Sequence, residues 1–171
     1  MGILVLILAL VAYVEISSIG KKYDAPYPDI KASTDPAVIA RGKYLAFGPA
    51  HCATCHSPVD KIMDVEAGLL EPPLTGGYGI KIPIGIFRAS NLTPDPETGI
   101  GKLTDAEIAR TLRHSVGSDG RLLIDFMPFQ NMSDEDLVAV ISFIRSQPPV
   151  RHEVERSAFN FLGRPLVLSW T

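Results

Sequence analysis

The sequence predicts a mainly α-helical fold, and three observations support this prediction. Three segments combine helical apolar spacing with recognisable end signals. The stretch between the first and second of these segments is rich in proline and glycine, and a strongly apolar segment opens the chain. We therefore expect one domain over residues 36–150, preceded by an N-terminal helix over 1–20 and a linker over 21–35, and followed by a tail over 151–171.

The first helix of the domain is expected to begin after Asp35, whose side chain can cap it, with Pro36 at its first position. Apolar side chains then follow a helical stripe at Val38, Ile39, Tyr44 and Leu45. Gly48 and Pro49 are typical residues for its end.

The second and third helices have equally clear starts. Thr104 and Glu107 form the pattern of a capping box, and apolar residues follow at helical spacing. Ser133 can cap the third helix, and the acidic residues behind it suit the positive end of the helix dipole. Pro148 and Pro149 would stop this helix. The three segments predict the helical core of the domain.

Residues 58–101 contain no long periodic pattern, although they are rich in proline and glycine. A loop of this length in a compact domain is usually functional. We expect it to wrap around a large apolar group.

The N-terminal segment is apolar from Gly2 to Val14 and continues to Ile19. As a helix, Gly2 to Ile19 would be roughly 27 Å long, near the lower limit for crossing a bilayer. We expect a single-pass membrane anchor. A cleaved secretory signal and a buried helix of the domain are the alternatives.

Composition excludes several classes of protein. The chain has 171 residues and a formal net charge of -3, and no basic cluster indicates a nucleic-acid partner. The hydrophobic fraction of 46% is typical of a folded protein rather than a disordered one. The charge is too small to indicate a particular partner.

The only cysteines, Cys52 and Cys55, are followed at once by His56, which gives the pattern C-x-x-C-H. Two thiols at this spacing on one helical turn can each add to a vinyl group of one haem, and the next residue then places its imidazole under the iron. A zinc site would need further ligands, and a thioredoxin-like motif would need a βαβ pattern. The motif predicts one covalent haem c, with His56 as the proximal iron ligand.

The second axial ligand is expected to be a methionine or a histidine. Met127 is the favoured residue, because it lies between the second and third helices and Pro128 stiffens the chain behind it. The other candidates are Met63, Met132, His114, His51 and His152.

Several segments resemble a known family, the class I c-type cytochromes, and in particular the membrane-associated cytochrome subunits of bacterial alcohol, aldehyde and gluconate dehydrogenases. The matching stretches over residues 36–150 are Arg41-Gly42-Lys43-Tyr44-Leu45, Ser90-Asn91-Leu92-Thr93-Pro94-Asp95, Thr98-Gly99-Ile100-Gly101, Thr104-Asp105-Ala106-Glu107, Asp119-Gly120-Arg121, Met127-Pro128 and Ser133-Asp134-Glu135-Asp136-Leu137. The resemblance implies the class I cytochrome c fold, in which three core helices and a long loop surround the haem. Those subunits often carry three haem domains, whereas this chain has one motif.

The resemblance also implies roles for individual residues. Gly42 and Tyr44 would allow the first and last helices of the domain to cross closely. Asn91 and Arg88 would lie near the haem propionates. A proline carbonyl, from Pro83 or Pro72, would accept a hydrogen bond from the proximal imidazole.

These observations predict a mono-haem electron-transfer protein rather than an enzyme. It would work on the periplasmic side of the cell membrane, between a redox donor and acceptor, as a subunit of a larger membrane complex in a respiratory or photosynthetic chain. The alternative is a haem enzyme or gas sensor with an open sixth coordination position, and a zinc or redox module is a second alternative.

Overall fold

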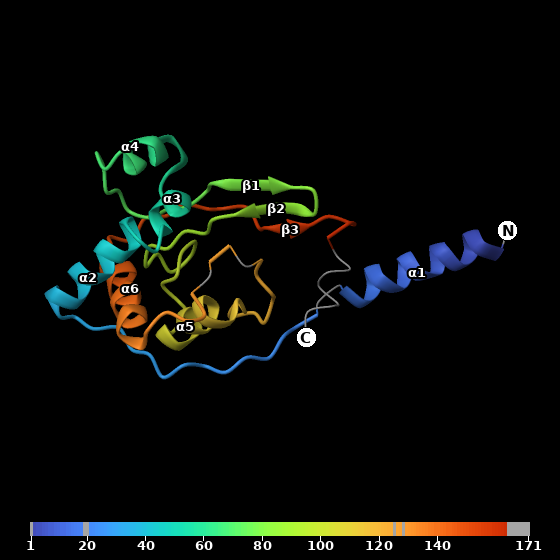
Figure 1. The fold of residues 1–171 in the computed structure, drawn as a ribbon, viewed down its shortest axis with the longest axis horizontal. Helices are drawn as coiled ribbons and strands as arrows, with labels where there is room; N and C mark the ends of the chain where they lie inside the picture. Colours follow the sequence, from blue (N-terminus) through green and yellow to red (C-terminus); the bar gives the residue numbers. More distant parts are fainter. Residues whose placement is uncertain (1, 19–20, 125, 128, 164–171) are drawn as a thin grey trace.

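The computed structural model describes residues 2–18, 21–124, 126–127 and 129–163. Its helices are α1 (Gly2–Ser18), α2 (Pro36–Phe47), α3 (Cys52–His56), α4 (Ile62–Glu66), α5 (Asp105–His114) and α6 (Asp134–Ser146), with a 3₁₀ turn, η1, at Val59–Lys61. Its strands are β1 (Gly79–Ile82), β2 (Gly85–Arg88) and β3 (Ala158–Phe159). Figure 1 shows α1 extending away from a domain that contains the other elements.

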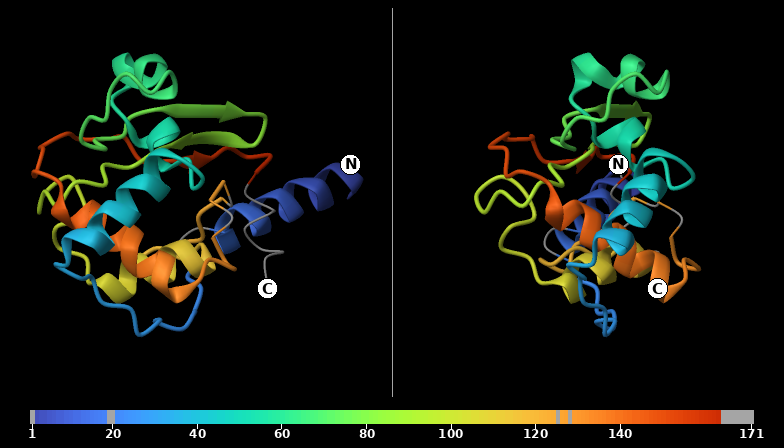
Figure 2. Two further views of the ribbon diagram at one scale, coloured as in Figure 1. Left: turned by 60° about the vertical axis from the view of Figure 1, so that its left-hand side comes forward. Right: turned by 90° about the vertical axis from the view of Figure 1, so that its left-hand side faces the viewer.

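The crossing of α2 and α6 forms the centre of the domain, and both views in Figure 2 show the two helices packed against each other. Gly42 makes the close approach possible, because a Cβ at this position would collide with the carbonyl oxygen of Ala139. Tyr44 takes no part, since it is 62% exposed. The aromatic contact at the crossing is instead Phe47 with Phe143, whose ring centroids lie 6.0 Å apart. The role expected for Gly42 is thus confirmed, and the one expected for Tyr44 is wrong.

The predicted helix caps are confirmed. The side chain of Asp35 accepts a hydrogen bond from the Ala37 N–H at 2.8 Å, and Ser133 caps α6 in the same way. Thr104 and Glu107 form a complete capping box at the start of α5. These local bonds satisfy N–H groups that have no partner inside the helix, which is why the helices begin where the sequence indicates.

A small antiparallel sheet occupies part of the region that was expected to lack regular structure. The strands β1 and β2 form a hairpin, in which Ile82 pairs with Gly85 across a turn at Pro83. The strand β3 adds to β2 from the tail beyond residue 150. The strands are only two to four residues long, so alternation along the sequence was too short to predict them.

Residues 21–35, which we call the strap, were expected to be a linker. They are extended and lie along α5 and α6 (Figure 1). Ile30 is buried in the main core. The Ala32 N–H donates to Asp105 at 2.8 Å, and the Ser33 N–H donates to the Ser142 hydroxyl at 2.7 Å. The strap is therefore packed on the domain rather than separated from it.

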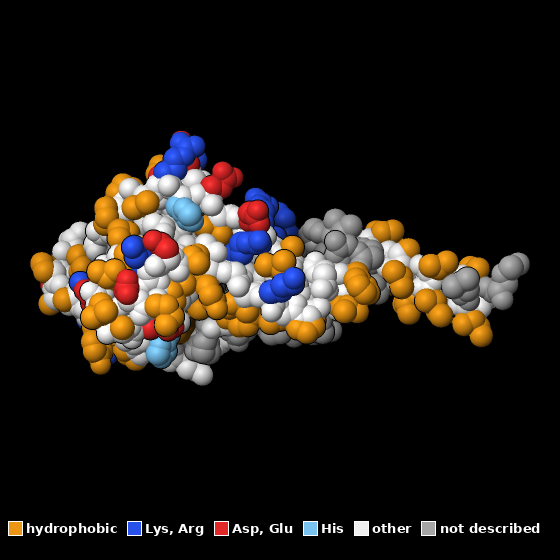
Figure 3. All heavy atoms as spheres, turned by 90° about the horizontal axis from the view of Figure 1, so that it is seen from above, with side chains coloured by type: hydrophobic (Ala, Val, Ile, Leu, Met, Phe, Trp, Pro, Cys, Tyr) orange, Lys and Arg blue, Asp and Glu red, His pale blue; other side chains and the backbone are white. Residues whose placement is uncertain are grey.

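The helix α1 carries mainly hydrophobic side chains, which Figure 3 shows along its visible surface. Those of Ile3, Leu6 and Ile16 are at least 70% exposed. In the part of the chain that the structure describes, no helix has both the length and the apolar character needed to cross a membrane. The transmembrane anchor expected over 1–20 is therefore unsupported. Residues 1 and 19–20 and the end of the tail, including Trp170, lie outside the described residues.

Candidate haem-binding site

The C-x-x-C-H motif forms the short helix α3, directly after α2. His51 enters it in the left-handed backbone conformation, with φ of 52°, and thereby turns the chain from α2 into α3. Residues three and four apart share one face of a helix, so Cys52, Cys55 and His56 lie on one side of α3. Thr54 lies on the opposite side. The backbone thus presents both thiols and the imidazole in one direction, as covalent haem attachment requires.

His56 is held by a carbonyl group that the sequence analysis did not identify. Its Nδ1 donates to the backbone oxygen of Ser90 at 2.7 Å. A carbonyl can only accept, so this bond places the proton on Nδ1 and leaves the lone pair of Nε2 for a metal ion. Burial lowers the pKa of His56, although the Ser90 bond opposes this shift. The imidazole is therefore neutral at pH 7 and suited to ligate iron.

Two glycines bring the Ser90 carbonyl to this position. The Gly76 N–H donates to the His56 carbonyl at 2.7 Å, and the Gly77 N–H donates to that of Ala89 at 2.8 Å. Gly76 has a φ of 75°, and a Cβ there would collide with the carbonyl oxygens of Ala89 and Ser90. The adjacent glycines were the only signal in the sequence for this close backbone approach.

The two thiols are in an environment that keeps them protonated. Burial raises the pKa of Cys52 to about 11. Burial also raises the pKa of Cys55, and the negative charge of Glu66 adds to the effect. Cysteines that act in thiol–disulfide exchange have lowered pKa values, so this environment does not favour a thioredoxin-like role. Across the described residues, no group of three or more His, Cys, Asp or Glu side chains is arranged to hold a metal ion.

Met127, the expected distal ligand, lies in the irregular segment between α5 and α6 and is half-buried. The ring of Phe126, the preceding residue, packs edge-on against Phe87 of β2, with centroids 5.9 Å apart. Phe87 packs in turn on Phe159 of β3 at 5.0 Å. The small sheet therefore supports the segment that carries Met127. Pro128 lies outside the described residues, and the ligand role of Met127 stays a prediction.

The other methionines lie in different surroundings. Met63 is 77% exposed on α4. Met132 packs against the core, and its carbonyl accepts a hydrogen bond from Arg113 at 2.8 Å. Neither Met63 nor Met132 therefore lies in surroundings that favour it over Met127 as the distal iron ligand.

Asn91, expected near the haem propionates, and Pro83, expected to hold the proximal imidazole, both have other structural roles. Asn91 is buried, its Nδ2 donates to the Val150 carbonyl at 2.8 Å, and its Oδ1 accepts from Thr93. Its amide is therefore engaged within the protein, which argues against a propionate contact. The Pro83 carbonyl accepts from Asn160 at 2.8 Å in the hairpin turn. The prediction that it holds the imidazole is wrong, because the Ser90 carbonyl takes that place.

Arg88 lies on β2, and its guanidinium forms an ion pair of 2.6 Å with Glu155. The side chain is 26% exposed. A haem propionate would have to compete with Glu155 for it, so its expected contact with a propionate stays a prediction.

The residues present fit a covalently bound haem, since a neutral imidazole with a free Nε2 lies on the same helix face as two thiols. This combination, next to the crossing of two helices, is typical of a c-type cytochrome. No family model matches the chain. It is similar, however, to curated proteins of known kind.

One subunit of the nicotinate dehydrogenase of Pseudomonas putida is 35% identical over 143 residues, 81% of this chain and 11% of that protein. The cytochrome c subunit of alcohol dehydrogenase (quinone) of Gluconobacter oxydans is 37% identical over 112 residues, 64% of this chain and 21% of that protein. The cytochrome c subunit of gluconate 2-dehydrogenase of Pantoea cypripedii is 33% identical over 138 residues, 78% of this chain and 28% of that protein.

The chain is thus a c-type cytochrome homologous to the cytochrome c subunits of bacterial dehydrogenases, and the resemblance stated from its motifs is confirmed. It spans less than a third of the length of these relatives. Two of these relatives are named as the cytochrome c subunits of dehydrogenases, which agrees with the expectation that this chain is an electron-transfer subunit rather than the enzyme itself.

Proposed function

We propose that the chain is a mono-haem electron-transfer cytochrome that serves a larger dehydrogenase-type complex at the periplasmic side of a membrane. The observation that carries the proposal is the bond between His56 Nδ1 and the Ser90 carbonyl, because it prepares Nε2 to ligate iron beside two attachment thiols. The single C-x-x-C-H motif supports one haem c. The relatives, which are named as subunits, support a complex.

The protein side chains have separate tasks in this function. Cys52 and Cys55 would form the thioether links, and His56 would be the proximal iron ligand. Met127 would close the opposite side of the iron, so that the haem supplies a one-electron couple and no open site for oxygen or peroxide. The Ser90 carbonyl strengthens the imidazole as a ligand and fixes the direction of its ring.

Haem attachment can be tested by producing the chain with a c-type maturation system. We expect a haem stain that survives denaturing electrophoresis, and a pyridine haemochrome spectrum of two thioether links with one haem per chain. Replacing both cysteines with alanine should remove the stain. A parent chain that carries no covalent haem would contradict the proposal.

The distal ligand can be tested by spectroscopy of the ferric protein. The parent should show the charge-transfer band of a methionine–iron bond, and Met127→Ala should lose it, whereas Met63→Ala should retain it. If the parent lacks the band and binds cyanide or azide rapidly, the iron has an open position, and the enzyme or gas-sensor alternative applies.

Membrane association is the second part of the proposal, and the exposed apolar side chains of α1 support it. The full chain should float with lipid vesicles in a density gradient, whereas Leu6→Asp/Leu10→Asp should remain in the dense fractions. Haem c attachment supports the periplasmic side. A protease added to spheroplasts should therefore digest the haem domain, and a protected domain would contradict this location.

A further inference from the structure

A group of exposed apolar side chains surrounds α4, the helix that follows the haem motif. Val59, Met63 and Leu69 are 57%, 77% and 72% exposed, and Leu70 is 41% exposed. We call these four residues the α4 apolar patch. Several large apolar side chains exposed within one short segment are characteristic of an interaction site in a soluble domain.

The backbone of this segment is well determined by its own hydrogen bonds. The Leu69 N–H donates to the Asp64 carbonyl at 2.8 Å, and Gly68 ends α4 with a φ of 70°. Val65 belongs to the main core cluster, which also contains Ala53. Cys52 packs against this cluster. The patch therefore lies on a fixed support that contacts the haem-attachment helix, as Figure 1 shows for α3 and α4.

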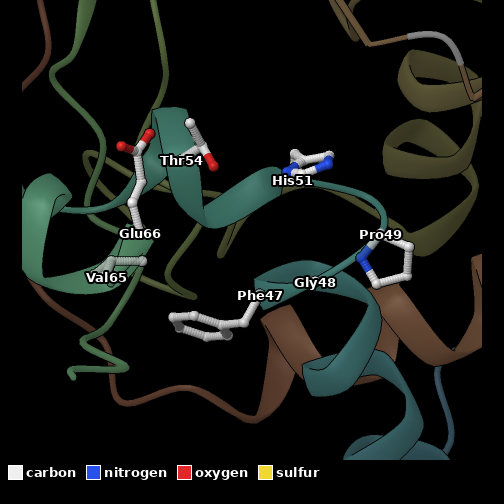
Figure 4. Close-up of a pocket in the computed structure, with 7 residues that line it drawn as sticks. All are labelled: Phe47, Gly48, Pro49, His51, Thr54, Val65 and Glu66. Carbon is white, nitrogen blue, oxygen red and sulfur yellow. The ribbon is translucent and has the colours of Figure 1, made fainter. Parts of the chain in front are cut away.

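A hollow of about 500 Å³ lies beside α4, between the end of α2 and α3. In Figure 4, the ring of Phe47 lies on one side of it and Thr54 and Glu66 lie on the other, with Val65 between them. Thr54 is on the side of α3 that faces away from the cysteines and His56. The hollow therefore lies behind the attachment helix, and its lining residue Glu66 is close enough to Cys55 for its charge to raise the pKa of that thiol.

The charges around the patch are mainly negative. The segment from residue 59 to 71 contains Asp60, Asp64, Glu66 and Glu71 against one lysine. Lys61 pairs with Asp60, and Lys43 of α2 pairs with Glu71. In the described part of the chain, no ion pair engages Asp64 or Glu66. The hollow thus combines apolar walls with an available carboxylate, which suits the aliphatic stem and charged end of a lysine or arginine.

We propose that the α4 apolar patch and this hollow dock an electron-transfer protein that presents a basic side chain beside an apolar surface. The inference rests on the proposed function, and it names the kind of partner. Glu66 would receive the cation while Phe47 and Val65 contact its stem. A second copy of this chain or an anionic membrane would bring negative charge against Asp64 and Glu66, so the charges favour a basic protein.

The test uses the haem-loaded full chain, reduced with ascorbate, and a strongly basic soluble cytochrome c as the probe. In the reaction, the ferrous chain loses one electron and the ferric probe gains it. Stopped-flow absorbance gives the second-order rate constant. We expect this constant to fall with ionic strength, and to be on the order of tenfold lower in Met63→Gln/Leu69→Gln and in Glu66→Gln. These side chains are exposed, so the variants should fold normally.

Two matched controls replace exposed residues outside the segment. Leu162→Gln and Glu153→Gln should keep the parent rate constant, because they lie in the C-terminal tail. Ferricyanide, a small anion that needs no docking surface, should oxidise all variants within about twofold of the parent rate.

The outcomes separate the two proposals. If the patch variants keep the parent rate constant, or if the controls lower it equally, the docking surface is wrong while the proposed function stands. If sedimentation or anionic vesicles reveal self-association or lipid binding that the patch variants abolish, a second copy or a membrane is the occupant, and the partner assignment is wrong. If even ferricyanide cannot oxidise the reduced parent, the proposed function fails and this inference fails with it.

Discussion

The guanidinium group of Arg110 lies over the ring of Tyr27, with 4.7 Å between its central carbon and the ring centroid. Arg110 belongs to α5 and is 4% exposed, and Tyr27 belongs to the strap. The Nη2 group donates to the Tyr23 carbonyl at 3.0 Å, and Nη1 donates to the Gly117 carbonyl at 3.3 Å. One buried cation thus joins the strap to the turn that precedes the Met127 segment.

Replacing Arg110 with methionine should destabilise the domain. The change keeps an apolar stem but removes the buried charge, its contact with the Tyr27 ring and its hydrogen bonds to the two carbonyls and to the Tyr27 hydroxyl, so we expect a loss of about 2–4 kcal/mol in the free energy of unfolding. Urea denaturation followed by circular dichroism measures this value. Arg151→Met is the matched control, because Arg151 is 75% exposed in a surface ion pair with Glu97 and should contribute less than about 1 kcal/mol. Equal losses in both variants would contradict the role of Arg110.

Gly76 should be intolerant of any side chain, because it has a positive φ and also touches the carbonyl that holds His56. Gly76→Ala should cost about 3 kcal/mol or more, and Gly68→Ala about 1 kcal/mol. Gly68 is a matched control, since its φ is 70° but a Cβ there has no atom within 4 Å. Thermal unfolding compares the two variants.

The variants Gly76→Ala and Gly68→Ala also test whether Gly76 influences the iron through the Ser90 carbonyl and His56. Displacing the Ser90 carbonyl weakens the bond to Nδ1, so Gly76→Ala should change the haem reduction potential, and Gly68→Ala should not. Spectroelectrochemical titration measures both. Equal potentials would contradict the proposed link between Gly76 and His56.

Phe87 should influence the distal ligand through Phe126. Phe87→Leu removes the edge-on ring contact beside Met127, so the Met–iron bond should be displaced at lower pH than in the parent. Phe159→Leu serves as the control, because Phe159 packs on Phe87 but has no ring contact with Phe126 within the described residues. Loss of the charge-transfer band during an alkaline titration measures the displacement. If both variants behave alike, general loosening of the sheet explains the effect.

The features that could be predicted from the sequence depend on neighbouring residues. The caps at Asp35, Thr104 and Ser133 are local bonds, so the starts of α2, α5 and α6 follow from a few residues each. The attachment motif is also local, because its chemistry lies in Cys52-x-x-Cys55-His56.

The features that could not be predicted connect distant residues. The acceptor for His56 is the backbone of Ser90, 34 positions away, and a carbonyl is present at every residue. The resemblance suggested a proline carbonyl, whereas the packing of Gly76 decided the position. The strap likewise contains no helical pattern, and its attachment depends on distant residues such as Asp105 and Arg110 of α5 and Ser142 of α6.

The Cys52 thiol predicts a pH dependence of the haem-free chain. Its pKa is about 11 in the folded state and about 8.5 in an unfolded chain, so the folded state retains the proton over this interval. Stability therefore falls as pH rises between about 8.5 and 11, because the unfolded state releases the proton first. The total loss in the free energy of unfolding over this interval is on the order of 3 kcal/mol.

Urea denaturation of the haem-free chain across this pH interval should show the loss of stability, and Cys52→Ser should show a smaller loss. In the haem-loaded chain a thioether cannot ionise, so this component should be absent. An identical pH dependence of stability in the haem-free parent and in Cys52→Ser would contradict the assignment to this thiol.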